Sequence, residues 1–155
     1  MVELVGGEGT LCAGGLGGEV SPARTDTPLV GLDLRIGQGR VELPTSGAFE
    51  HAVVPVDGRI KVGPEVVEPG WLALVPPGVE ELPIETENGG ARMLLLGGLP
   101  FGEQVTMWWN YVARSQDEIT QAWRDWEERT ERFGPVPTKL ERIEAPVPPW
   151  VYPQD

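Results

Sequence analysis

Short turn signals recur along the first hundred residues at nearly even spacing, and this spacing constrains the fold more than any other feature. Short antiparallel strands in a sandwich or a barrel have this rhythm. No helical period of useful length precedes residue 115, so βαβ units and a parallel sheet are excluded. The turn signals are Asp57-Gly58, Pro69-Gly70, Pro77-Gly78, Asn88-Gly89 and Gly97-Gly98, at intervals of 12, 8, 11 and 9 residues.

Apolar and polar residues alternate between these turns, which predicts strands with one buried face. Pro55 interrupts one such run, and we expect it at a sheet edge or a bulge because it cannot donate a hydrogen bond. The glycine-rich segment 6–19 is not followed by the residues of a phosphate-binding loop, so we interpret it as hairpin turns and close backbone packing. The apolar positions predicted to share a buried face are Leu32/Leu34/Ile36, Ile60/Val62, Leu72/Leu74 and Leu82/Ile84.

One amphipathic helix is predicted over about residues 115–133. Ser115 and Glu118 form a capping box at its start, and Gly134 followed by Pro135 ends it. Residues 135–155 are rich in proline and predict an extended tail. The apolar stripe of the helix consists of Ile119, Ala122, Trp123, Trp126, Thr130 and Phe133.

The composition favours a single domain and argues against several partners. A chain of 155 residues can bury a core without disulfides. Its net charge of −12 repels phosphate backbones, which argues against direct nucleic-acid binding. No apolar run approaches the roughly 20 residues that span a bilayer, and residues 1–20 lack the pattern of a signal peptide. With Cys12 as the single cysteine, we expect a soluble protein of the cytoplasm.

Four stretches of this sequence resemble the second half of pirin-family proteins. They are SPARTDTPLVGLDL (21–34), AFEHAVVPVDGRIKVG (48–63), LLLGGLPFGEQVTMWWNYVARSQDEI (94–119) and RFGPVP (132–137). Pirins are bicupins, with two β-barrel cupin halves in one chain. The resemblance implies a mainly β fold, a single cupin-type antiparallel β-barrel or jelly roll with one C-terminal helix. We expect a cupin domain over residues 1–134, including the helix, and a tail over residues 135–155 packed on that domain.

The family's iron-type metal site lies in the first half and uses three histidines and a glutamate. Setting Phe49-Glu50 against the family's Phe-Glu strand places two of these histidines near Pro44 and Ser46. The later His and Glu fall within residues 79–82, Val-Glu-Glu-Leu. His51 is the only histidine of the chain, and redox ions of this kind need imidazole ligands. The sequence therefore predicts no metal, no cofactor and no catalytic residue in this chain.

A few residues remain as candidates for a barrel pocket or an interface. Adjacent strand residues point to opposite faces, so Glu50 and His51 cannot both face the interior. Trp71 and the Trp108-Trp109 pair are large apolar groups able to line a barrel mouth or meet a partner. The candidate residues are His51, Glu50, Trp71, Trp108 and Trp109.

Three functions stay open at this point. The favoured one is a metal-free structural or protein-interaction module that forms a homodimer, or binds a separate cupin half, in place of the first pirin half. The second is part of a pirin-like quercetin (flavonol) dioxygenase whose metal site lies in a separate half. The third is a metal-free cupin that binds a small apolar molecule in its barrel. Fold kinship does not decide among them, and we lean against catalysis by this chain alone.

Overall fold

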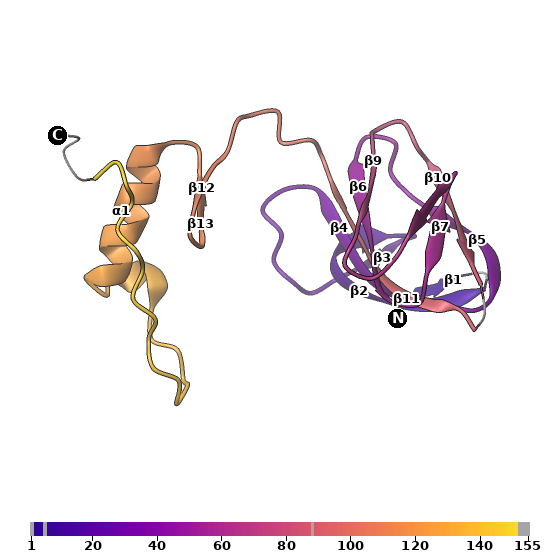
Figure 1. Ribbon diagram of the computed structural model, residues 1–155, viewed down its shortest axis with the longest axis horizontal. Helices are drawn as coiled ribbons and strands as arrows, with labels where there is room; N and C mark the ends of the chain where they lie inside the picture. The colour runs from indigo at the N-terminus through magenta and orange to yellow at the C-terminus, as the bar shows by residue number, and fades with distance from the viewer. Residues whose placement is uncertain (1, 5, 88, 152–155) are drawn as a thin grey trace. The chain divides into compact units, whose positions relative to one another are not determined.

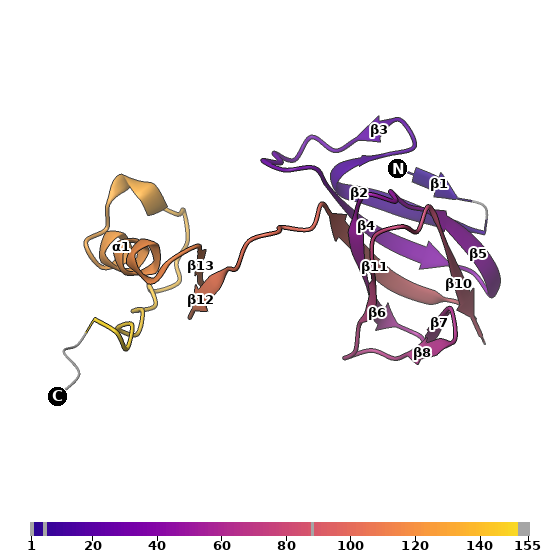
Figure 2. The ribbon, with the colours of Figure 1, turned by 90° about the horizontal axis from the view of Figure 1, so that it is seen from above.

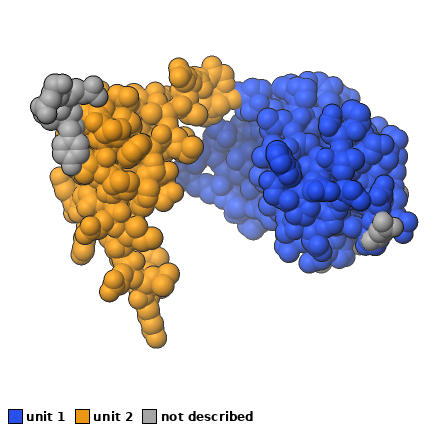
Figure 3. All heavy atoms as spheres, in the orientation of Figure 1, with its two compact units in different colours: residues 1–100 blue, residues 101–155 orange. Residues whose placement is uncertain are grey.

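The computed structural model describes residues 2–4, 6–87 and 89–151. The chain divides into two compact units, residues 1–100 and residues 101–155, which are coloured separately in Figure 3. Each unit has its own apolar core. The predicted domain of residues 1–134 with a separate tail stays a prediction, but the residues after Pro100 group with the helix rather than with the strands.

The first unit consists of antiparallel strands in two sheets (Figures 1 and 2). The larger sheet has the order β1-β2-β4-β11-β6-β9, with β3 paired to β2, and the smaller has the order β5-β10-β7-β8. The strands of the larger sheet are β1 (Val2–Leu4), β2 (Gly7–Leu16), β3 (Glu19–Val20), β4 (Leu29–Ile36), β6 (Glu50–Asp57), β9 (Ala73–Val75) and β11 (Ala91–Gly98). The strands of the smaller sheet are β5 (Gly39–Pro44), β7 (Ile60–Val62), β8 (Glu65–Val67) and β10 (Glu81–Thr86).

The core of this unit lies between the two sheets, because both contribute buried side chains to one cluster. Leu34 and Ile84 are completely buried, and the predicted inward phase is confirmed for β4, β7 and β10. The prediction was wrong for β9. There Ala73 and Val75 face inward, whereas Leu72 and Leu74 are 52% and 78% exposed. Residues 71–75, Trp-Leu-Ala-Leu-Val, are all apolar, so the sequence offers no polar and apolar alternation from which to fix the phase.

Two predictions on backbone geometry are confirmed. Pro55 lies at a register shift between β6 and β11. The pairing is interrupted at this bulge, so the sheet does not require a hydrogen bond from an N–H at position 55. The glycine-rich segment forms β2 and its turn into β3. Gly14 has a φ of 73°, and a Cβ there would overlap the carbonyl group of Leu29. Only glycine fits both constraints.

The second unit holds a short hairpin and the helix. β12 (Thr106–Trp108) pairs with β13 (Tyr111–Ala113), and α1 (Gln116–Glu127) follows, then a 3₁₀ turn, η1 (Glu131–Phe133). Ser115 caps α1, with its Oγ accepting a hydrogen bond from the Glu118 N–H at 3.2 Å. The helix is shorter than predicted, because Arg129 has a φ of 56° and turns the chain out of the helical path. In the described part of the chain no helix is long and apolar enough to cross a membrane.

The proline-rich tail, residues 135–151, lies along the helix through hydrogen bonds from three indole N–H groups. Trp126 donates to the Ile143 carbonyl at 2.9 Å and Trp150 donates to Thr120 Oγ1 at 2.9 Å. Trp108 donates to the Pro146 carbonyl at 3.3 Å. The core of this unit is small, with Tyr111, Ile119, Ala122 and Ala145 buried and the aromatic residues packed around them.

Candidate functional site

The only histidine lies on the inner face of the larger sheet. His51 is the second residue of β6, and its Cα partners are Val75 on β9 and Gly97 on β11. Its ring occupies space that a side chain at position 97 would fill, since a Cβ on Gly97 would lie 2.4 Å from the His51 Cδ2 atom. Phe49 tilts against it, with the ring centroids 6.1 Å apart. The sequence places an imidazole inside the sandwich because glycine stands opposite it.

Burial dominates the chemistry of this imidazole. His51 is 2% exposed, and neither ring nitrogen has a hydrogen-bond partner among the described residues. Desolvation lowers the pKa of His51 below its usual 6.5, because burial disfavours the charged ring. The side chain is therefore a neutral base in an apolar enclosure.

The donor set around His51 does not fit the metal centre that the family resemblance implies. A non-haem redox site needs several imidazoles or imidazoles with a carboxylate on one open face. The chain has one histidine, and Val75, Gly97 and Phe49 beside it offer no ligand atom from their side chains. No group of three His, Cys, Asp or Glu side chains in the described ranges is arranged to hold an ion.

Most of the positions at which the family's metal ligands would fall lie along a shallow polar hollow of about 640 Å³. Hydrogen bonds join its two loops, from the Thr45 N–H to the Glu80 carbonyl at 2.8 Å and from the Gly78 N–H to the Gly47 carbonyl at 2.8 Å. Thr45 Oγ1 also donates to the Val79 carbonyl at 2.8 Å. Two carboxylate side chains, Glu80 and Glu81, line the hollow, and none of its lining residues is a histidine. It is lined by Pro44, Thr45, Ser46, Gly47, Glu80 and Glu81.

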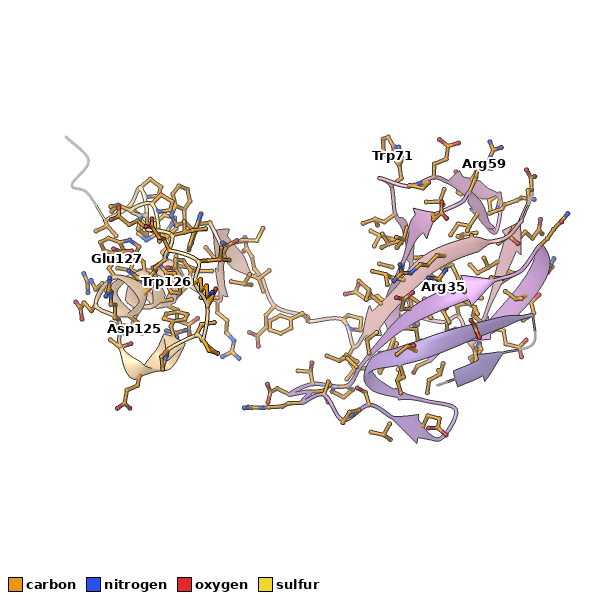
Figure 4. The ribbon with its side chains drawn as sticks, turned by 90° about the horizontal axis from the view of Figure 1, so that it is seen from below. Arg35, Arg59, Trp71, Asp125, Trp126 and Glu127 are labelled. Atoms are coloured by element: carbon orange, nitrogen blue, oxygen red, sulfur yellow. The ribbon has the colours of Figure 1, made fainter. Side chains whose placement is uncertain are left out.

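The other candidate residues come from β6, from the connection between β8 and β9, and from the second unit. Glu50 is exposed, as expected for the neighbour of an inward residue. Trp71 is 74% exposed in the connection from β8 to β9, where Figure 4 shows it projecting from the ribbon. Trp108 and Trp109 are half-buried and belong to the core of the second unit. A barrel pocket built from all five residues stays a prediction.

Sequence reasoning missed a second hollow, of about 810 Å³, that lies wholly within residues 101–155. Trp126 and Phe133 form its aromatic side, in an edge-to-face pair with centroids 5.3 Å apart. The Arg142 guanidinium lies 4.3 Å from the centre of the Trp126 ring and donates to the Trp126 carbonyl. Trp109 adopts the left-handed φ of 53° at its rim. Figure 4 labels Trp126 on the helix. The unusual φ values at Trp109 and Arg129 have no signal in the sequence.

Comparison with known proteins identifies the family. The model of the Pirin C-terminal cupin domain matches residues 31–134, which is more than half of the chain. The chain belongs to the pirin family. Its mainly β architecture is therefore the cupin jelly roll, with two antiparallel sheets in the first unit and, in the described part of the second unit, the β12–β13 hairpin and α1.

Two relatives of this pirin-family chain carry the name of a dioxygenase. A protein of Pseudomonas aeruginosa, named as a candidate quercetin 2,3-dioxygenase, is 40% identical over 144 residues, covering 91% of this chain and 45% of the relative. A second protein of that organism with the same kind of name is 32% identical and covers 78% of this chain and 42% of the relative. The crystal structure of quercetin 2,3-dioxygenase from Acinetobacter baumannii matches with a TM-score of 0.81 and 35% identity, over 96% of this chain and 50% of that one. The chain thus spans about half the length of the relatives that it matches.

Proposed function

We propose that this chain is a non-catalytic cupin module, whose work is to pack against a second cupin barrel. The enclosure of its sole imidazole by apolar groups supports this proposal more than any other observation. A ring that is 2% exposed, lies beside Val75 and Gly97, and has no hydrogen-bond partner among the described residues is packed as a core side chain rather than as a metal ligand. The proposal therefore assigns no metal and no cofactor to the chain.

The second barrel is either another copy of the chain or a separate cupin domain. The relatives are about twice as long as this chain, and such a domain would correspond to the part of them that the chain does not match. Exposed apolar side chains on the first unit support a packing role, because such groups gathered on one face mark interaction sites. The single cysteine, Cys12, is an exposed free thiol. A thiol of this kind persists in a reducing compartment, which supports a cytoplasmic location.

Metal loading and turnover test the proposal directly. The purified chain is incubated anaerobically with Fe(II), desalted and assayed for bound iron, then supplied with quercetin and O₂. We expect sub-stoichiometric iron and no oxygen consumption above that of the buffer. Quercetin-dependent oxygen uptake by the chain alone would refute the proposal.

A second function follows from the names of the relatives. The chain would be the partner half of a quercetin 2,3-dioxygenase, with the metal held by a separate polypeptide. Its 40% identity to one half of the Pseudomonas aeruginosa protein favours this alternative. The test is complementation, in which the unmatched half of that protein is assayed for quercetin oxidation with and without this chain. A gain in activity on mixing supports the alternative, and equal rates count against it.

A further inference from the structure

The proline-rich tail lies against the helix with the three-residue repeat of a polyproline II segment. Ala145 and Pro148 are buried, and Arg142, three positions before Ala145, is half-buried. A second half-buried line, Val147 and Trp150, has the same spacing. A polyproline II helix has three residues per turn, so each of its faces recurs at every third position. Three of the residues 145–149 are prolines, which fix their own φ at about −65° and keep the preceding residue extended. The tail therefore presents a polyproline II helix to the rest of the second unit.

A groove between the hairpin and the helix holds this segment through its backbone. Trp108 on β12 and Trp126 on α1 donate their indole N–H groups to tail carbonyls, at 3.3 and 2.9 Å. Glu127 accepts a hydrogen bond from the Ala145 N–H at 3.2 Å, and Figure 4 labels Trp126 and Glu127 on the helix. A polyproline II segment has no internal hydrogen bonds, so its backbone groups are free for a partner surface. Aromatic-lined grooves of other proteins recognise proline-rich peptides in this way.

The first position of the repeat is a cation with three contacts in the groove. The Arg142 guanidinium lies 4.3 Å from the centre of the Trp126 ring and donates to the Trp126 carbonyl. It also lies 3.8 Å from a carboxylate oxygen of Glu127. A planar guanidinium stacks on an aromatic ring and pairs with a carboxylate at the same time, which an ammonium group does less well. The groove therefore fits the pattern Arg-x-x-Ala-x-x-Pro, read from Arg142 to Pro148.

We propose that this groove is a recognition site for basic proline-rich segments, that residues 142–150 occupy it in cis, and that such a segment of a partner protein replaces them. The proposal concerns the second unit alone and goes beyond the proposed packing function. The charge of the chain favours a basic ligand, because a net charge of −12 attracts cationic peptides and Glu127 meets their arginine in the groove.

The tail is held loosely enough to be replaced. Within residues 135–151, all of which the structure describes, only Ala145 and Pro148 are buried. The hollow of about 810 Å³ lies between the helix and residues 134–143, so this part of the tail contributes little packing. A short tether gives the tail an effective concentration in the millimolar range. The tail therefore competes with a partner segment, and detaching it should raise the affinity of the groove for an added peptide.

A synthetic peptide with the sequence of residues 140–151, labelled with fluorescein, tests the proposal by fluorescence anisotropy. Ala145→Asp in the full chain places a carboxylate beside Glu127 and should release the tail. We expect this protein to bind the peptide with a dissociation constant of about 10–100 µM, and the unchanged chain to bind it at least about tenfold more weakly. Val136→Asp is the matched control, because Val136 is a tail residue outside the groove segment and is 71% exposed. It should bind as weakly as the unchanged chain.

A second measurement uses the unchanged chain and does not depend on the folding of a variant. The indole N–H of Trp150 donates to Thr120 Oγ1 at 2.9 Å, and its ring meets Trp108 edge-to-face with centroids 5.8 Å apart. When unlabelled peptide in excess displaces the tail of a ¹⁵N-labelled chain, the Trp150 indole signal should move to its position in an unfolded peptide. A peptide carrying Arg142→Glu should bind at least about tenfold more weakly and leave this signal in place, because it loses the contacts with Trp126 and Glu127.

Three results would overturn the inference. One is a folded Ala145→Asp chain, with its helix retained by circular dichroism, that does not bind the peptide at about 1 mM. Another is equal binding of the unchanged and Arg142→Glu peptides. The third is a chain that sediments as a dimer and becomes a monomer in Ala145→Asp, because the occupant would then be the tail of a second copy. None of these results bears on the proposed lack of catalysis, which bound iron and oxygen uptake decide.

Discussion

Replacing His51 by leucine should stabilise the first unit. A buried polar group without a hydrogen-bond partner costs about 1–3 kcal/mol, and both His51 nitrogens lack one among the described residues. Leucine has a similar volume and no polar atom, so His51→Leu should increase the free energy of unfolding by about that amount at pH 7.5.

The difference between the two proteins should grow on acidification. Burial lowers the pKa of His51 in the folded state, so below pH 6.5 the unfolded chain binds a proton that the folded chain does not. The histidine protein then loses up to about 1.4 kcal/mol per pH unit as the pH falls from 6.5 toward the folded-state pKa. Between pH 7.5 and pH 5 the gap to His51→Leu should therefore widen by up to about 2 kcal/mol.

Urea unfolding followed by far-UV circular dichroism measures this difference, because the strands dominate the first unit. Tryptophan fluorescence is the wrong signal, since five of the six tryptophans lie in residues 101–155. His51→Gln is the matched control, because it keeps a buried polar group but does not titrate. It should lack both the gain at pH 7.5 and the extra loss in acid.

Two results would refute the reasoning. One is a gap between the unchanged chain and His51→Leu that stays the same from pH 7.5 to pH 5. The other is a proton NMR titration of the single histidine with a midpoint at or above 6.5, which would mean that the ring has a charged or hydrogen-bonded partner.

Three further changes have predictable effects on the free energy of unfolding. Gly97→Ala should cost about 1–3 kcal/mol, because its Cβ would lie 2.4 Å from the His51 ring, and an unchanged melting temperature would contradict the placement of that ring. Ser115→Ala should cost about 1 kcal/mol in the second unit, measured by tryptophan fluorescence on urea unfolding, because the Glu118 N–H loses its acceptor; Ser115→Asp should restore most of it. Asp33→Asn should reduce the acid sensitivity of the first unit. The hydrogen bond from Arg92 lowers the pKa of Asp33, so the contribution of this carboxylate to the free energy of unfolding is lost as the pH falls below 3.8. Equal acid unfolding curves for the two proteins would show that the pair contributes nothing to stability.

Much of the first unit could be predicted from the sequence, because alternation over six to eight residues fixes which face of a strand is buried. The buried positions of β4 and β10 illustrate this. The same reasoning failed for Leu72 and Leu74, because residues 71–75 are all apolar and the pairing of β9 with β6 decides which of them face inward.

The helix shows a similar limit. The cap at Ser115 could be predicted because it depends on two residues three apart in the chain, and the hydrogen bond from the Glu118 N–H to Ser115 Oγ confirms it. The Glu118 carboxylate accepts from the Arg114 N–H instead of the Ser115 N–H. The helix end could not, because Arg129 takes a left-handed conformation that no glycine signals.

The site was predictable only in part. The single histidine was evident from the sequence, but its enclosure depends on Gly97, which is 46 residues away and pairs with it across two strands. The hollow around Trp126 depends on the tail returning along the helix through Ile143 and Arg142. Contacts of that range leave no periodic pattern.

Calorimetric titration of Fe(II) into the purified chain under anaerobic conditions, with His51→Leu measured in parallel, tests whether the His51 imidazole binds a metal ion. We expect the same weak, sub-stoichiometric heats for both proteins. One equivalent of tightly bound iron that disappears in His51→Leu would contradict it, because the imidazole would then be a ligand rather than an enclosed neutral base.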